Sequence, residues 1–153
     1  MKKIVIVSPY FGKFPDTIEL TFSTMEHNST IDWIIFTDNI EYVNRYKNIK
    51  FIKMSFGDVK ELIKDKFGTS ISTPYKICDY RPAYGVMFHD YIKNYDFWGY
   101  CDLDMIFGNL RNYFTDERLK KYDKIYDAGH LSLYRNNKAV SYAFMGTEEY
   151  QVP

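Results

Sequence analysis

The chain has 153 residues, enough for one folded domain, and its hydrophobic content of 46%, with 19% aromatic residues, is ample for a core. Twenty basic residues balance twenty acidic ones, so the formal net charge is zero and we expect neither nucleic-acid binding nor general attraction to an anionic membrane. The apolar start ends at Ser8 and Pro9, too early for a signal peptide, and no other run approaches membrane-spanning length, which indicates a cytoplasmic protein.

The first half of the chain alternates short apolar runs with amphipathic segments. The β-branched and aromatic runs predict strands, and apolar residues at helical spacing predict helices. In chain order we expect a strand at 3–7, a helix from about Pro15, strands at 33–36 and 49–54, and a helix over 58–67.

The second half opens with residues 68–73, which are small and polar and predict a mobile loop. Pro74 then restarts helical structure, and Pro82 marks a first turn or a kink. Apolar side chains at i, i+3, i+4, i+7, i+8 and i+11 predict one core-facing helix stripe, made of Tyr84, Met87, Phe88, Tyr91, Ile92 and Tyr95. A strand at 97–101, a helical turn at 110–114 and strands at 124–126 and 130–134 complete the chain.

Strands that alternate with helices predict an α/β sandwich with a largely parallel sheet. Ligands of such sheets gather outside the carboxyl ends of the strands. Three polar loops follow predicted strands, at residues 8–12, 37–39 and 102–104. We therefore expect these loops to meet at one edge of the sheet and to form a site of nucleotide size.

Asp102 and Asp104 most directly indicate a ligand. They close the apolar run at 97–101 and precede a second one at 105–107. If the segment stays extended, their side chains leave the same face, two residue rises of roughly 3.3 Å apart. Apolar neighbours would bury these carboxylates unless a cation or hydrogen-bond donors satisfied them. The pair therefore predicts a Mg²⁺ or Mn²⁺ site, because both cations combine one or two carboxylates with substrate phosphates and water.

The cysteines and histidines do not indicate a second metal site. Cys78 and Cys101 lie among apolar residues without a Cys-x-x-Cys spacing, so we expect buried free thiols. The three histidines are scattered, which argues against a zinc hydrolase.

Three segments together carry a resemblance to a known family. They are the strand and loop at 4–12, the stretch KICDYRPAYG at 76–85 and the stretch YCDLDMIFG at 100–108. With them the chain resembles a GT-A-fold glycosyltransferase, of a bacterial family associated with capsular or other surface polysaccharide synthesis. The resemblance spans residues 3 to about 135 and implies a Rossmann-like three-layer sandwich. It implies transfer of a sugar from a nucleotide-sugar donor to a polysaccharide or glycan acceptor, assisted by a divalent cation. The protein could then associate peripherally with a membrane-bound assembly system.

The resemblance also implies roles for single residues. Asp104 would coordinate the metal most directly, and Asp102 would contact the ribose or the water shell of the metal, so that these two form the predicted catalytic pair. Tyr10, in the first loop, would stack on the base, and Asp38 would bind the base or ribose. The alternatives are that Tyr10 only packs and that Asp38 only forms a turn. A later histidine completes the metal shell in some GT-A enzymes, but it lies nearer the C-terminus, so we expect His130 to be a packed or exposed side chain.

Lys76, Asp79 and Arg81 are further candidates for donor binding. Lys76 and Asp79 share a face if their segment is helical. Arg81 or Lys76 would then offset the diphosphate charge, and Asp79 would accept a hydrogen bond from a donor-sugar hydroxyl. The alternative is a surface ion pair before a helix that starts at Pro82.

The expected organisation is a single nucleotide-sugar-binding domain over residues 1–153. The stretch after Asp104 is short for an enzyme of this kind, which suggests truncation at the C-terminus. A non-catalytic nucleotide- or carbohydrate-binding domain is therefore one alternative function. A haloacid-dehalogenase-like phosphatase is another, in which the first aspartate of the pair is the nucleophile and the second the general acid; its motif normally opens the chain, whereas Asp102 follows three expected strands.

Overall fold

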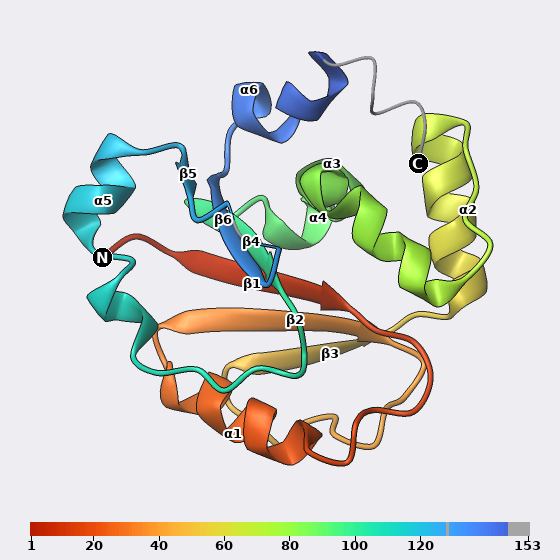
Figure 1. Ribbon diagram of the computed structural model, residues 1–153, viewed down its shortest axis with the longest axis horizontal. Coiled ribbons are helices and arrows are strands. Elements are labelled where there is room, and N and C mark those ends of the chain that lie inside the picture. The colour runs from red at the N-terminus through yellow and green to blue at the C-terminus, as the bar shows by residue number, and fades with distance from the viewer. Residues whose placement is uncertain (128, 147–153) are drawn as a thin grey trace.

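The computed structural model describes residues 1–127 and 129–146 and contains one mixed sheet (Figure 1). Its strand order is β3-β2-β1-β4-β6-β5. The strands are β1 (Ile4–Pro9), β2 (Ile31–Thr37), β3 (Ile49–Lys53), β4 (Phe97–Cys101), β5 (Lys124–Ile125) and β6 (Leu131–Arg135). Strands β1 to β4 pair in parallel, whereas β6 is antiparallel to β4 and β5 is antiparallel to β6. The α/β prediction with a largely parallel sheet is confirmed, with an antiparallel pair at one end.

Helices cover both faces of the sheet. On one face α1 (Ile18–His27) packs Ile18, Phe22 and Met25 into a core shared with Ile6 and Trp33 of the sheet. The other face is covered by α2 (Phe56–Phe67), the 3₁₀ segment η1 (Pro74–Ala83), α3 (Tyr84–Met87) and α4 (His89–Ile92) (Figure 1). Buried apolar side chains on both faces explain why β1 and β4 read as continuous hydrophobic runs.

Gly99 allows the antiparallel strand β6 to lie close to β4. A Cβ atom at this position would lie 2.4 Å from the carbonyl oxygen of Ser132. In register, Gly99 faces Leu133 of β6 and Ile6 of β1. A residue without a side chain is therefore required in the middle of the sheet.

The first two helices follow local signals. The α1 helix begins at Ile18, later than the expected start at Pro15, because Pro15 supplies a turn carbonyl to the Ile18 N–H instead. Helix α2 begins two residues before the expected start. Ser55 and Asp58 form a capping box there, and Gly68 ends the helix in the left-handed region with φ of 71°.

The prediction of one helix across residues 84–95 is wrong. The segment divides into α3 and α4 at Phe88, whose ring stacks on Phe36 of β2 with centroids 4.2 Å apart. The amide of Asn136 then donates to the carbonyls of Ile92 and Tyr95, where the helical stretch ends. Tyr91 is 41% exposed and does not belong to the core stripe. Tertiary contacts therefore override the helical periodicity of this segment.

The stretch 68–73 is anchored, in contrast to the expected mobile loop. Ile71 is buried, and the hydroxyl groups of Thr69 and Tyr80 form a 2.6 Å hydrogen bond. This stretch leads directly into η1, and the hydrogen bond ties it to the second half of that segment.

The C-terminal elements are short. They comprise η2 (Leu110–Asn112), α5 (Asp116–Lys121), α6 (Lys138–Ser141) and η3 (Ala143–Gly146). The expected helical turn near 110–114 and the two expected strands are present with bounds shifted by one or two residues. Both cysteines are free as expected, but only Cys101 is buried, since Cys78 is half-buried. Within the described residues, none of the helices combines the length and apolar character that crossing a membrane requires.

Candidate functional site at the carboxyl ends of β1 and β4

The sheet has a topological switch point between β1 and β4. From β1 the chain proceeds through β2 to β3 on one side, whereas β4 lies on the other side of β1. The loops after β1 and β4 therefore diverge, and the crevice between such loops is where open α/β sheets bind ligands. Ser8 joins the two strand ends, because its hydroxyl donates to the carbonyl of Cys101 at 3.0 Å. Asp102 follows immediately.

Asp102 is held by two side chains from distant parts of the chain. Its Oδ1 accepts a hydrogen bond from Nη2 of Arg81, and its Oδ2 lies 3.1 Å from Nδ1 of His130. The backbone N–H of Asp102 donates to the His130 carbonyl at 3.0 Å. The Asp102 side chain is 26% exposed. Hydrogen-bond donors of the protein thus satisfy this half-buried carboxylate. Its apolar neighbours required either such donors or a cation.

Arg81 connects η1 to both chain segments of the site. Its Nη1 donates to the Gly129 carbonyl at 2.7 Å, while Nη2 reaches Asp102. The guanidinium lies over the ring of Tyr100, 5.2 Å from the centroid. Burial of the guanidinium opposes its positive charge, whereas the nearby Cys78 and Asp102 favour that charge. The second effect is larger, so the pKa of Arg81 is raised. Arg81 is therefore a fixed cation at the crevice.

Asp104 has a different environment from Asp102. Strand β4 ends at Cys101, and Leu103 and Asp104 lie in a bend. Leu103 is buried, whereas Asp104 is exposed and has no hydrogen bond or ion pair with any residue that the structure describes. Of the two carboxylates, Asp104 is the one that an incoming ligand can reach without displacing a partner.

Tyr10 and Asp38 both take part in contacts within the chain. Tyr10 stacks on Phe14 with centroids 5.1 Å apart, and its hydroxyl donates to the Lys13 carbonyl. Asp38 accepts the backbone N–H of Gly12 at 2.8 Å, which ties the loop after β2 to the loop after β1. The structure therefore brings the two predicted loops together. Tyr10 makes the packing contact of its structural alternative, whereas Asp38 links two loops and does not form the expected local turn.

Lys76 and Asp79 form an ion pair on the surface of η1, with Nζ and Oδ2 3.0 Å apart. Their side chains are exposed to 52% and 37%. This is the contact expected of the surface-pair alternative. Arg81 does not share in it and binds Asp102 instead.

The sequence did not single out Gly129 and His130 as partners of Asp102. The expectation of an exposed histidine agrees with its 75% side-chain exposure, yet the ring contacts the carboxylate. Antiparallel pairing of β6 with β4, which places Leu131 opposite Cys101, brings His130 to this position. A strand pairing between segments so far apart leaves no local signal in the sequence.

The side chains suit a cation that takes most of its ligands from a substrate. Within residues 1–127 and 129–146, no three Asp, Glu, His or Cys side chains converge as a preformed metal site. Mg²⁺ keeps several waters and often uses only one or two carboxylates with substrate phosphates. Asp104 fits as a direct ligand, and Asp102, already engaged by Arg81 and His130, fits as an indirect one.

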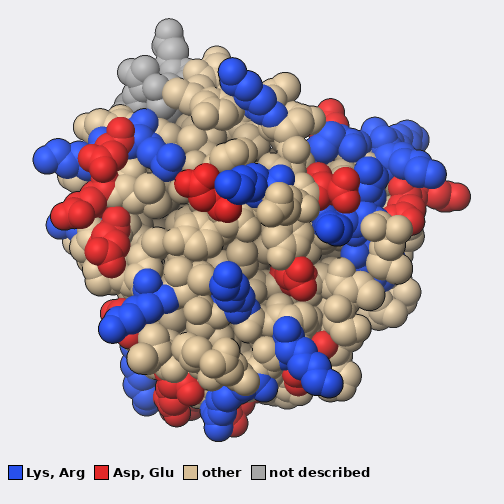
Figure 2. All heavy atoms as spheres, turned by 180° about the vertical axis from the view of Figure 1, so that it is seen from behind, with Lys and Arg blue, Asp and Glu red and all other residues tan. Residues whose placement is uncertain are grey.

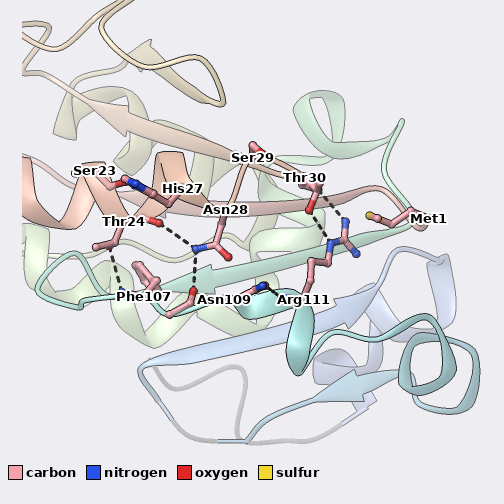
Figure 3. Close-up of a pocket in the computed structure, with 11 residues that line it drawn as sticks. Met1, Ser23, Thr24, His27, Asn28, Ser29, Thr30, Phe107, Asn109 and Arg111 are labelled. Carbon is pink, nitrogen blue, oxygen red and sulfur yellow. Dashed lines mark hydrogen bonds between the residues drawn. The ribbon is translucent and has the colours of Figure 1, made fainter.

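A hollow of about 650 Å³ lies at the opposite edge of the sheet, where α1 ends and β2 begins (Figure 3). Its polar groups mainly hold the chain together. Asn28 donates to the carbonyls of Thr24 and Gly108 and accepts the Leu110 N–H. Arg111 donates to the hydroxyl and carbonyl of Thr30. These hydrogen bonds hold residues 107–111 beside α1. The hollow is remote from the carboxyl ends of the strands.

A family model described as "Family of unknown function (DUF6625)" matches residues 6–152. No curated protein and no solved structure matches the chain.

Proposed function

The chain belongs to the DUF6625 family, and we propose that it is a glycosyltransferase domain that binds a nucleotide sugar with a divalent cation at the carboxyl ends of β1 and β4. The acceptor in this proposal is a polysaccharide or other glycan. The observation that carries the proposal is the position of Asp102, bound to Arg81 at the topological switch point of the sheet, with the exposed Asp104 two residues further along the chain.

The charges at this edge suit a diphosphate leaving group. When the bond between the sugar and the diphosphate breaks, negative charge develops on the phosphate oxygens, and fixed positive groups stabilise it. Arg81 is such a group, because three contacts hold its guanidinium in place. Lys76 adds a second, exposed cation on the same 3₁₀ segment.

Asp102 and Asp104 have different roles in this proposal. Arg81 and His130 hold Asp102 in place, and the second lone pair on each of its oxygens would accept a ribose hydroxyl or a metal-bound water. Asp104 would hold the cation directly, and a bound divalent cation supplies charge that stabilises the departing diphosphate. Tyr10 and Asp38 would line the nucleotide side of the crevice from the loops after β1 and β2.

The phosphatase alternative fits this arrangement less well. A nucleophilic aspartate attacks phosphorus with one carboxylate oxygen, and an ion pair or hydrogen bond to that oxygen weakens it as a nucleophile. Both oxygens of Asp102 are engaged, one by Arg81 and one by His130. Asp102 is therefore suited to orienting a ligand and not to attacking one.

Calorimetric titration with UDP, GDP, CDP and TDP, in Mn²⁺ and in chelator, tests the proposal. We expect one nucleotide to bind in Mn²⁺ only, and Asp104→Asn to abolish that binding while the protein stays folded. Asp65→Asn is the matched control, because Asp65 is an exposed carboxylate on α2.

Unchanged metal-dependent binding in a folded Asp104→Asn protein would disprove the proposed cation site. Binding followed by slow hydrolysis of the matching nucleotide sugar would support a transferase. Binding without hydrolysis or transfer to any glycan would favour the non-catalytic alternative instead.

A further inference from the structure

A second cavity, of about 380 Å³, lies between the α3–α4 segment and the chain that leaves β6. Trp98 of β4 supports both of its walls. On one side Gly85 of α3 packs so closely on the indole that a Cβ would lie 2.6 Å from it. On the other side Trp98 Nε1 donates to the hydroxyl of Ser141 in α6 at 3.3 Å. The cavity is therefore a preformed feature of the fold.

The amino end of β4 is close to this cavity. The Asn136 N–H donates to the carbonyl of Asp96, the residue before β4. Asp102 follows the opposite end of the same strand. The cavity is therefore separate from the proposed nucleotide site.

Three basic side chains line the cavity. His89 and Lys93 come from one side, four residues apart, and Lys138 comes from α6 on the other. The described residues that line it include no aspartate or glutamate. This concentration of one charge is local, because the chain as a whole has a formal net charge of zero.

The basic groups have little compensation within the described chain. His89 and Lys138 have no side-chain partner there, and Lys93 Nζ lies 4.0 Å from Asp90 Oδ1, at the outer limit of an ion pair. For comparison, Lys13 and Asp16 form a closer ion pair, with Nζ and Oδ1 3.0 Å apart. On the face shown in Figure 2, basic and acidic side chains are interspersed. Two lysines whose charges have little compensation, together with the His89 ring, favour an anionic ligand at this cavity.

Neutral donors extend the same surface. Asn137 uses its Oδ1 to accept the Val140 N–H, which leaves its side-chain NH₂ for a ligand. Tyr142, which carries a hydroxyl group, also lines the cavity. Lysines and neutral N–H and O–H donors together suit an anion with several acceptor oxygens. The volume falls within the range of small-molecule sites.

We propose that this cavity binds a phosphoryl group, through Lys93, Lys138 and His89. The group can belong to a small phosphorylated metabolite or to a lipid headgroup, since both present the same oxygens. The proposal does not depend on the function proposed for the Asp102 site.

Calorimetry with glycerol 3-phosphate, in chelator and with glycerol as the uncharged control, tests the metabolite form. We expect wild type to bind glycerol 3-phosphate and not glycerol. The Lys93→Gln/Lys138→Gln variant should bind at least about tenfold more weakly, because each lysine contributes a charged hydrogen bond. Lys64→Gln/Lys66→Gln on α2 removes the same charge elsewhere and should leave binding unchanged. Amide NMR shifts should change at Gly85 and Asn137.

Sedimentation with phosphatidylcholine vesicles, with and without phosphatidylglycerol, tests the lipid form. Co-sedimentation that requires phosphatidylglycerol and is lost in the Lys93→Gln/Lys138→Gln variant would support a headgroup as the source of the phosphoryl group. The proposal is overturned if wild type binds neither glycerol 3-phosphate nor these vesicles. It is also overturned if the double variant binds as well as wild type.

Discussion

The guanidinium of Arg81 and the carboxylate of Asp102 form an ion pair across 21 residues of sequence, at the point where β4 ends. The pair is mostly shielded, with side chains exposed to 21% and 26%. Because Arg81 also binds the Gly129 carbonyl, it joins η1, the end of β4 and the turn before β6. The packing of these three chain segments against one another therefore depends on the Arg81 side chain.

Replacing Arg81 with lysine tests this connection. Lysine keeps the charge but lacks the planar fork that reaches Asp102 and Gly129 together. We expect Arg81→Lys to lower the free energy of unfolding by about 1–3 kcal/mol, measured by urea denaturation, because one of the two acceptors loses its partner. Lys76→Gln, which breaks an exposed ion pair on the same segment, should change it by less than about 0.5 kcal/mol. Equal effects of the two substitutions would contradict the connecting role of Arg81.

Replacing Gly99 with alanine tests the close approach of β4 and β6. The added Cβ would meet the Ser132 carbonyl oxygen, and a backbone atom in a paired strand cannot move aside cheaply. We expect Gly99→Ala to destabilise the protein by about 1–3 kcal/mol or more in thermal or urea unfolding. Gly108→Ala is the control, since a Cβ there would meet no described heavy atom within 4 Å. A Gly99→Ala protein as stable as Gly108→Ala would show that the strands can separate freely.

Replacing Asp96 with asparagine tests the acid sensitivity of the fold. The backbone N–H of Lys3 and the ammonium group of Lys2 bind this carboxylate and hold its pKa below the usual value. Since the unfolded chain binds the proton more tightly, the stabilisation is present above about pH 4 and is lost as the pH falls through the lower, folded pKa.

Unfolding free energies of wild type and Asp96→Asn, measured from pH 7 to pH 2, should therefore differ most at neutral pH and converge in acid. Asp90→Asn, an exposed carboxylate on α4, is the charge-matched control. A constant difference between wild type and Asp96→Asn across the pH range would rule out this role for Asp96.

Local sequence patterns sufficed for the elements that form the sheet. The apolar runs at 3–7, 33–36 and 97–101 became strands buried on both faces, which requires nearly uninterrupted hydrophobic side chains. The run at 49–54 became the edge strand β3, in which Lys50 and Lys53 are exposed. The alternation of parallel strands with helices then predicted that the loops after β1, β2 and β4 would meet at one edge of the sheet. In the structure Asp38 links the loop after β2 to the loop after β1, and Ser8 links the end of β1 to the end of β4.

Tertiary structure decided the helical break at Phe88 and the partners of Asp102. The helix breaks at Phe88, whose ring stacks on Phe36, a contact between segments distant in sequence. Arg81 and His130 reach Asp102 only because η1 packs on the sheet and β6 pairs antiparallel with β4. Hydrophobic periodicity records which side chains are buried along one segment, and the identity of each partner depends on how separate segments pack together.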